Sequence, residues 1–262
     1  MRVTSLYRYP IKGLSPERLD RLTLSPGEYV PGDRLYAIEN GPSGYDGDWP
    51  DQPAKIRFLM LMRQERLAEL DTRWDEASGI LTIRHRGETT ASGDLRTPEG
   101  RAVIARFFEA FMGEEMRGPA RILEAPSGRR FTDARDGHVS IINLASVRAL
   151  EEKLGVRVDP LRFRGNIHLE GLAPFAEFDL LGRVLAGPDG LRLKVQRRIQ
   201  RCAATNVDLA TGHRDLQIPR TITETYGHAD CGVYARVLTG GAIRVGESFR
   251  EEEPRQASLS FA

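Results

Sequence analysis

Cysteine is scarce in this chain, with Cys202 and Cys231 the only two among 262 residues. Two thiols cannot build a four-cysteine zinc or iron-sulfur site within one chain, so sites of that kind are excluded. The two cysteines could in principle form a disulfide, but a chain of this size that is not exported is expected to keep both as thiols.

Long apolar runs are missing as well. No stretch approaches the roughly 20 apolar residues that a helix needs to span a bilayer, and the opening residues, MRVTSLYRYPIKG, lack the apolar core of a signal peptide. The sequence therefore predicts a cytoplasmic protein that does not bind a membrane.

An excess of one charge is also absent, because 38 Lys and Arg balance 37 Asp and Glu. A net charge of +1 gives no overall field toward nucleic acid or an anionic membrane, so any anion site must be local. Two stretches are rich in basic residues, although either one alone could be a solvated surface: Arg129, Arg130 and Arg135, and Lys194, Arg197, Arg198 and Arg201.

The remaining composition, 40% hydrophobic and 29% charged, is that of an ordinary globular protein. In the first half, alternating segments bounded by Gly and Pro predict strands at 3–9, 18–24, 34–39 and 80–85, with a loop from Gly41. The stretch 55–74 carries mixed signals and is assigned to a strand because its apolar residues alternate towards the end. Thr97 and Pro98 predict a helix through about Met112, whose apolar stripe would pack on a sheet: Val103, Ile104, Phe107, Phe108 and Phe111.

The second half continues the β-rich pattern. A strand at 138–142 runs into Asn143, a good N-cap for a helix that presents Val147, Leu150 and Leu154 before Gly155 ends it. Further strands are predicted at 167–169, 178–180 and 191–195, followed by a hairpin of 232–238 and 242–249 closed through Gly240 and Gly241. The last residues, 251–262, are predicted to be a loose tail.

Cys202 has the most reactive sequence surroundings in the chain. It follows an alternating strand and lies close in sequence to Lys194, Arg197, Arg198 and Arg201. Nearby cations stabilise a thiolate, which is both a nucleophile and a metal ligand. A small buried core cysteine is the simpler alternative, and spacing alone does not decide between them.

An ordered set of segments resembles a known family. The segments FRGN at 163–166, QRC at 200–202, NVDLATG at 206–212, CGVYARV at 231–237 and GAIRVGESF at 241–249 resemble the MOSC domain. YPIKGL at 9–14 and PGDRLYAIEN at 31–40 resemble the β-barrel domain that precedes MOSC in the amidoxime-reducing component and its bacterial relatives. The resemblance implies a β-rich α+β fold, with a MOSC-type β-barrel and peripheral helices at 116–250, packed against a smaller N-terminal β-barrel-like domain at 1–115 and followed by the tail.

The resemblance also implies a site. In MOSC oxidoreductases a cysteine ligates molybdenum held by a pyranopterin dithiolene, and its match here is Cys202. The family positions suited to holding this molybdenum cofactor are Lys12, Gly13, Arg34, Arg164, Asn166, Gln200 and Arg201. Arg can grip a phosphate with two hydrogen bonds, Lys can neutralise it, and Asn can pair with the pterin edge. Each residue alone could instead be structural, as a turn cation, a surface ion pair or part of a strand-end network.

Several positions depart from the family pattern. Gly13 and Gln200 stand where relatives usually have Ser, and Cys231 stands where the eukaryotic relatives carry an aromatic residue. Cys231 is expected to be a buried structural thiol. Asp133 and Asp136 both compete for the family's aspartate near the metal, while His138 is expected to be a core or capping residue.

The resulting hypothesis is a molybdenum-cofactor-dependent oxidoreductase that reduces N-hydroxylated or N-oxide small molecules. Because the chain lacks the cysteines of a ferredoxin-like domain, electrons would come from a separate partner, such as a ferredoxin, a flavoprotein or a cytochrome b5-like protein. One alternative is a non-catalytic cofactor carrier or sulfur-handling accessory protein, since a fold does not settle activity. Another is a β-barrel that binds a different anion.

Overall fold

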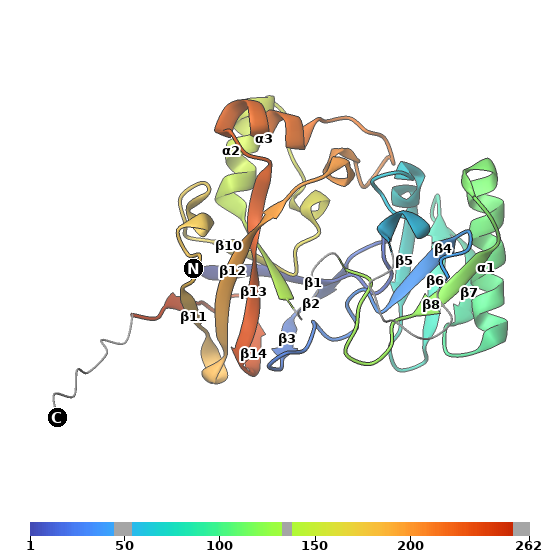
Figure 1. Ribbon diagram of the computed structural model, residues 1–262, viewed down its shortest axis with the longest axis horizontal. Helices are drawn as coiled ribbons and strands as arrows, with labels where there is room; N and C mark the ends of the chain where they lie inside the picture. The colour runs from blue at the N-terminus through green and yellow to red at the C-terminus, as the bar shows by residue number, and fades with distance from the viewer. Residues whose placement is uncertain (45–53, 133–137, 254–262) are drawn as a thin grey trace.

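The computed structural model describes residues 1–44, 54–132 and 138–253. Figure 1 shows two halves side by side, one built mainly from the C-terminal strands with α2 and α3, the other containing β4 to β8 and α1. The sequence-based assignment to a β-rich α+β fold is confirmed. No helix among the described residues is long and apolar enough to cross a membrane.

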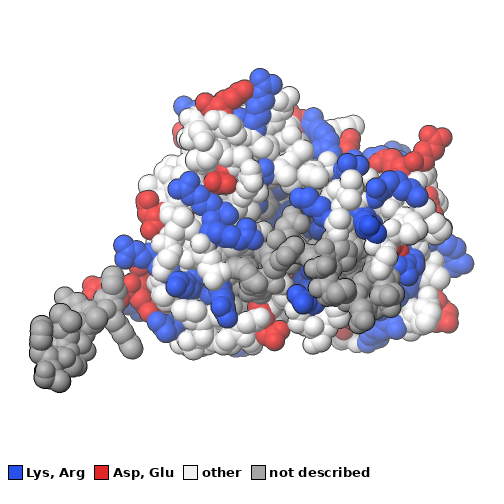
Figure 2. All heavy atoms as spheres, viewed as in Figure 1, with Lys and Arg blue, Asp and Glu red and all other residues white. Residues whose placement is uncertain are grey.

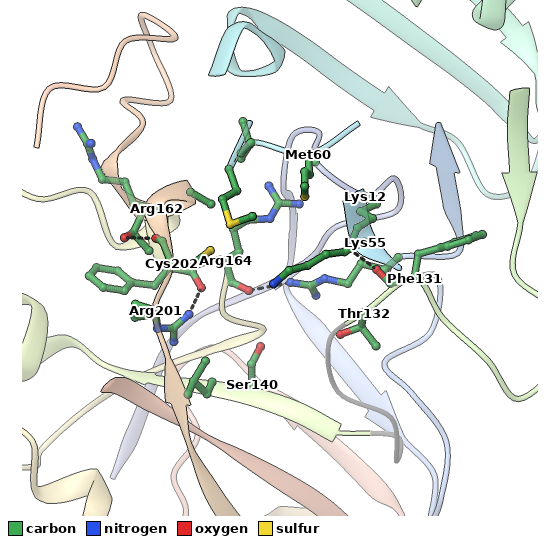
Figure 3. A pocket seen from close by; sticks show the side chains of 18 of the residues that line it. Lys12, Lys55, Met60, Phe131, Thr132, Ser140, Arg162, Arg164, Arg201 and Cys202 are labelled. Atoms are coloured by element: carbon green, nitrogen blue, oxygen red, sulfur yellow. Dashed lines mark hydrogen bonds between the residues drawn. The ribbon is translucent and has the colours of Figure 1, made fainter. Parts of the chain in front are cut away.

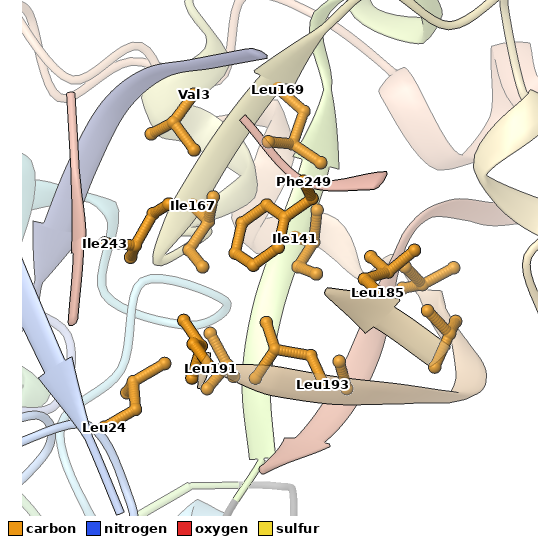
Figure 4. Packing of buried hydrophobic residues seen from close by; sticks show 14 of the residues in the cluster. Val3, Leu24, Ile141, Ile167, Leu169, Leu185, Leu191, Leu193, Ile243 and Phe249 are labelled. Carbon is orange, nitrogen blue, oxygen red and sulfur yellow. The ribbon is translucent and has the colours of Figure 1, made fainter. Parts of the chain in front are cut away.

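The larger half is organised by one curled sheet of eight strands. In spatial order they are β15 (Arg250–Glu251), β11 (Val184–Ala186), β12 (Arg192–Gln200), β13 (Asp230–Thr239), β9 (His138–Asn143), β10 (Ile167–Glu170), β1 (Arg2–Arg8) and β2 (Glu17–Leu19). Leu193 and Val195 of β12 alternate with exposed neighbours, because successive side chains of a strand point to opposite faces. Their inward faces meet Ile141, Ile167 and Phe249 in a core that Figure 4 shows.

The smaller half packs a helix on short sheets. Its strands form two antiparallel sets, β4 (Tyr36–Asn40) with β8 (Ala120–Glu124), and β5 (Leu70–Trp74), β6 (Ile80–His85) and β7 (Glu88–Asp94). As predicted, Thr97 caps α1 (Pro98–Met112) by accepting a hydrogen bond from the Gly100 amide. Ile104 and Phe108 are buried, whereas Val103, which was predicted to face the core, is 37% exposed. Val103 lies just beyond the stripe that a period of 3.6 residues turns inward.

Strands from the beginning of the chain pair with strands from its C-terminal part. β1, at the start of the chain, pairs with β10, and β3 (Arg21–Leu24) pairs with β14 (Gly241–Arg244). The first strands therefore belong to the sheet system of the C-terminal half, and the chain then crosses to the smaller half. This crossing places residues 9–14 and 31–36 at the seam between the two hydrophobic cores.

One predicted hairpin is wrong. β14 follows β13 in sequence, but it pairs with β3, not with β13. A Cβ atom at Gly241 would lie 2.9 Å from the Leu191 amide nitrogen. The glycine is therefore needed where two backbones approach closely, which a two-residue turn motif does not reveal.

Of the other predicted elements, some are confirmed and some are wrong. Asn143 caps α2 (Leu144–Leu154) and Gly155 ends it in the left-handed conformation, as predicted. Only 70–74 of the stretch 55–74 is a strand, because Lys55–Arg57 and Glu65–Glu69 form short 3-10 turns (η1, η2). The predicted strand at 178–180 is wrong, since Ala176–Phe178 is a 3-10 turn (η5). Among the elements that the sequence analysis did not predict are β7, β8 and α3 (Ile218–Tyr226). Nine residues of the predicted tail, 254–262, lie outside the described residues.

Candidate functional site

A cleft lies where the two halves meet, and every residue predicted to form the site lines it. These residues are Lys12, Gly13, Arg34, Arg164, Asn166, Gln200, Arg201 and Cys202. In Figure 3, Cys202 and Arg201 lie on one side, Lys12 and Phe131 on the other, and Arg164 between them. Segments separated by up to 190 residues are thus brought to one place by the strand exchange.

Cys202 stands at the end of β12, where the strand gives way to the short turn η7 (Ala203–Asn206). Its backbone carbonyl accepts hydrogen bonds from the Thr205 amide, at 3.1 Å, and the Thr205 hydroxyl, at 2.9 Å. The side chain itself is exposed. The sulfur is therefore accessible from the cleft and is not the buried core thiol of the simpler alternative.

Cys231 contrasts with Cys202. It is fully buried on β13, and burial raises the pKa of its thiol to about 12. A thiol with such a pKa is protonated at neutral pH and unreactive. The expectation of a structural thiol is confirmed for this residue.

The basic residues next to Cys202 in sequence do not surround it in space. Lys194, Arg197 and Arg198 are exposed side chains of β12, and Figure 2 shows basic side chains gathered over β12 and β13. Arg197 lies over the Tyr234 ring, whereas Arg198 lies over the Phe178 ring. Only Arg201 of this group lines the cleft. Most of the cations that line the cleft with Cys202 therefore come from segments distant in sequence, which corrects the expectation that its sequence neighbours surround it.

Charge in the cleft is strongly unbalanced. Among the described lining residues the acidic side chain is Asp33 alone, whereas the basic ones are Lys12, Arg34, Lys55, Arg162, Arg164 and Arg201. Such a surface is suited to an anionic ligand.

Arg34 and Arg164 form one wall of the cleft together with Tyr9. Both arginines have left-handed backbones, with φ of 47° and 51°. Their guanidinium carbons lie 4.7 and 4.3 Å from the centre of the fully buried Tyr9 ring. Left-handed backbone at a residue with a side chain is strained, and such strain persists where the surroundings determine the conformation.

The two guanidinium groups differ in their partners. Burial acts to lower the pKa of Arg34, but the adjacent Asp33 carboxylate outweighs it and raises that pKa. Arg164 has no ion pair with a carboxylate among the described residues, and burial, followed by repulsion from Arg34, lowers its pKa to about 10. Its Nη1 donates to the Leu14 carbonyl at 2.8 Å, whereas its Nη2 is buried without a hydrogen-bond partner among the described residues. A buried cationic donor in this state favours an anion as its partner.

Lys12 and Gly13 approach the cleft from the turn after β1. The Lys12 ammonium donates to the Phe131 carbonyl at 3.2 Å. Gly13 has a φ of +85°, and a Cβ atom there would lie 3.2 Å from the Leu59 carbonyl oxygen. The departure from the usual serine is therefore matched by a backbone that favours glycine.

Asn166 and Arg201 line the cleft but serve its framework. The Asn166 side-chain oxygen accepts from the Ser140 amide at 3.1 Å and hydroxyl at 2.6 Å, and its nitrogen donates to the Tyr7 carbonyl at 3.2 Å. Arg201 donates to the Cys231 carbonyl from Nε, at 2.7 Å, and to the Phe163 carbonyl from Nη1, at 2.8 Å. These contacts hold the strand ends that frame Cys202. The role of Asn166 toward a pterin edge stays a prediction.

Several lining residues were not singled out in the sequence: Tyr29, Lys55, Met60, Met62, Phe131, Thr132 and Tyr234. Tyr234 belongs to the CGVYARV segment and Phe131 and Thr132 open the FTDARDG segment, so the resemblance covered them without marking them as lining residues. Asp133 and Asp136, and the side chain of His138, lie outside the described residues. Within the described part of the chain, no group of three or more His, Cys, Asp and Glu side chains could hold a metal ion.

The fold and the cleft define a class of protein, a β-rich molecule of two interlocked halves that presents a thiol in a cationic cleft. Comparison with family models identifies the family. The MOSC N-terminal beta barrel domain matches residues 1–115, and the MOSC domain matches residues 128–250. The chain therefore belongs to the MOSC domain proteins that carry this N-terminal domain, as its motifs predicted.

A molybdenum cofactor sulfurase from Anopheles gambiae is 32% identical over 138 residues. The match covers 46% of this chain but 18% of the relative, so the chain spans less than a fifth of that protein. Among solved structures, YiiM from Geobacillus stearothermophilus is 25% identical, with 44% of this chain and 54% of that one covered and a TM-score of 0.35. The YuaD protein from Bacillus subtilis is 14% identical, with 95% and 93% covered and a TM-score of 0.44.

Proposed function

We propose that the cleft binds a molybdenum cofactor and that the protein reduces N-hydroxylated or N-oxide small molecules. The observation that carries this proposal is the pairing of an exposed Cys202 thiol with a cationic wall that includes a buried, unpartnered Arg164 nitrogen. The proposal builds on membership of the MOSC family, whose motifs match this cofactor chemistry.

The donor set of the cleft fits such a group. Cys202 would contribute a thiolate to the metal, and Arg164 and Lys12 would bind the phosphate and the polar edge of the pterin. When bound, the cofactor would supply the two-electron redox chemistry. The protein's part is to orient the group and to hold its negative charge among fixed cations, since six basic side chains line the cleft and two of them, Arg34 and Arg162, are already paired with carboxylates.

Arg34 would act together with Arg164. Because Arg34 is neutralised by Asp33 and its Nη2 donates to the Arg164 carbonyl at 3.0 Å, it fixes the position of its neighbour and adds little net charge. The free donor capacity of the wall therefore resides mainly in Arg164. In this proposal a separate protein delivers the electrons to the cleft.

A second candidate is a cofactor carrier or sulfur-handling accessory protein without turnover of its own. It is favoured by the likeness to a molybdenum cofactor sulfurase over 46% of the chain. Both candidates need the same cleft, because a carrier must also bind the cofactor. They differ in whether a reducible substrate is converted at Cys202.

The test begins with protein produced in a host that makes the cofactor and is supplied with molybdate. Molybdenum is measured by mass spectrometry and pterin by fluorescence after oxidative release, and both are expected near one per chain. A ratio near zero for both contradicts the proposal and leaves a barrel that binds another anion. Cys231→Ala is the matched control, because it removes the other thiol outside the cleft.

Loaded protein is then given an amidoxime and a chemically reduced viologen dye. The expected result is formation of the amidine with oxidation of the dye. Full molybdenum occupancy without turnover of amidoxime, N-oxide or hydroxylamine would favour the carrier.

A further inference from the structure

The segment that follows Cys202 folds into a compact loop, residues 203–215, here termed the bracket loop. Val207 pairs with Arg214 in an isolated antiparallel bridge. The Asp208 amide donates to the His213 carbonyl at 2.7 Å, and the Asp208 carboxylate accepts from the amides of Ala210 and Thr211. These hydrogen bonds make the bracket loop a preformed unit and not a slack connection.

One side of the bracket loop is fixed to the larger half of the molecule. Arg162, only 3% exposed, donates from Nη1 to Asp215 at 2.6 Å and from Nη2 to Asp208 at 2.9 Å. Its Nη1 also reaches the Asn206 carbonyl at 3.2 Å. A forked ion pair made by a buried arginine is geometrically specific.

The other side of the bracket loop is fixed to the smaller half, which contains β4 to β8 and α1. Val207 is fully buried in the hydrophobic core of that half, together with Leu59 and Leu67. The backbone at Gly212 packs so closely on η2 that a Cβ atom would lie 2.8 Å from the Glu69 side chain. The residues directly after the thiol thus reach across the seam into the opposite core.

Arg214 connects the segment after Cys202 with the opposite wall of the cleft. Its Nη1 donates to the carbonyl of Ala203, the residue after Cys202, at 2.9 Å. Its Nη2 donates to the carbonyls of Leu61 and Met62, at 3.1 and 3.0 Å, and to the Glu65 carboxylate at 3.0 Å. Leu61 and Met62 line the same cleft as Cys202.

We propose that the bracket loop sets the position of the Cys202 thiol relative to the cations of the smaller half, and that Arg214 is the positioning residue. One guanidinium holds the backbone beside the thiol and the backbone of the opposite wall, so a relative shift of the two walls strains four hydrogen bonds at once. This positioning of the thiol by Arg214 goes beyond the proposed function and does not depend on which ligand the cleft binds.

The test uses the thiol as its own probe, in the full chain without added cofactor. Rates of Cys202 alkylation are measured with iodoacetate, an anion, and iodoacetamide, a neutral analogue, and the modified site is identified by peptide mass spectrometry. Both reagents attack the same thiolate, so the ratio of their rates cancels the thiolate fraction and reports the local electrostatic field. In the wild-type protein at low salt we expect a ratio above that of free cysteine, falling toward it as salt is added.

Arg214→Lys keeps the charge but loses the fork that bonds several carbonyls. We expect its ratio to fall about threefold at low salt, because the thiol leaves the cationic wall. Glu65→Gln removes one anchor and one negative charge. A purely electrostatic effect would raise its ratio, whereas a positioning effect lowers it.

Arg220→Ala is the control, since Arg220 is exposed and its side chain pairs with Glu224 on α3. Its ratio should match the wild-type value. Continued protection of Cys231 from both reagents reports that each variant is folded. A wild-type ratio in Arg214→Lys, together with a raised ratio in Glu65→Gln, would overturn the positioning role. Failure of the proposed function would instead be seen as absent molybdenum in the wild-type protein.

Discussion

The Nη2 of Arg34 donates a hydrogen bond to the backbone carbonyl of Arg164 at 3.0 Å, across 130 positions of sequence. The two side chains also share the Tyr9 ring. Two like charges are thereby held side by side, and within the described part of the chain Arg34 alone of the two pairs with a carboxylate, that of Asp33. This arrangement costs folding energy and is explained if the wall serves an anion.

Replacement of Arg164 by Met should therefore stabilise the cofactor-free protein while weakening the retention of an anionic ligand. The substitution removes a buried charge with an unpartnered Nη2, at the loss of one hydrogen bond to Leu14. We expect a gain of about 1 kcal/mol in the free energy of unfolding, measured by urea denaturation. Arg220→Met, at an exposed position, should leave this free energy unchanged. A loss of stability in Arg164→Met would show that the wall is satisfied as it stands.

Replacement of Cys202 by Ala should separate the metal from the pterin. The thiolate would be lost, but the basic residues that surround the phosphate would remain. We expect molybdenum content and amidoxime reduction to fall to background, while part of the pterin stays bound. Cys231→Ala should keep both metal and pterin, because that thiol is buried away from the cleft. Full molybdenum in Cys202→Ala would remove the thiol from the proposed site.

Replacement of Gly13 by Ser, the residue usual in relatives, should destabilise this protein. Gly13 has a φ of +85°, and its Cβ would crowd both the Leu59 carbonyl and the Leu67 side chain. Gly27 is a matched control, since its φ is +73° with nothing within 4 Å of a Cβ. Thermal unfolding should show a loss of about 1 kcal/mol for Gly27→Ser and about 2 kcal/mol for Gly13→Ser. Equal losses would mean that the site relaxes to admit the serine.

His168 should make stability depend on pH. The residue is 2% exposed, and burial, followed by the Arg201 charge, lowers the pKa of its imidazole to about 4. Between pH 4 and the unfolded value near 6.5 the unfolded chain binds the additional proton, so stability falls as the pH is lowered through this window. The contribution lost by pH 4 is about 3 kcal/mol.

The variant His168→Phe isolates this effect from the carboxylates, which titrate in part of the same range. Urea denaturation of both proteins from pH 4 to 7 gives their unfolding free energies. The wild-type value minus the His168→Phe value should rise as the pH rises. A difference independent of pH would assign the acid sensitivity to other groups.

Much of the local structure was predictable because its causes are local. Thr97 and Asn143 cap their helices with their own side chains, and Gly155 ends α2 through its own backbone freedom. The hairpin at Gly240 and Gly241 was wrong for the opposite reason, since β14 pairs with β3, more than 200 residues earlier in the chain. The boundaries at 115 and 250 stay predictions, and the exchange of β1 and β3 shows that contacts ignore such a division.

The sequence by itself determined the β-rich class, the ends of α1 and α2, the family and a set of candidate residues, because residue type, spacing and motif order carry those properties. Only the tertiary structure decided which cations line the cleft with Cys202, because most of them come from segments distant in sequence, and of the four basic residues close to Cys202 in sequence only Arg201 lines it. It also decided that Arg164 Nη2 has no hydrogen-bond partner among the described residues, that Asn166 hydrogen-bonds Ser140 and Tyr7, and that Arg214 bridges the seam. Those facts depend on contacts between distant segments, which no local pattern records.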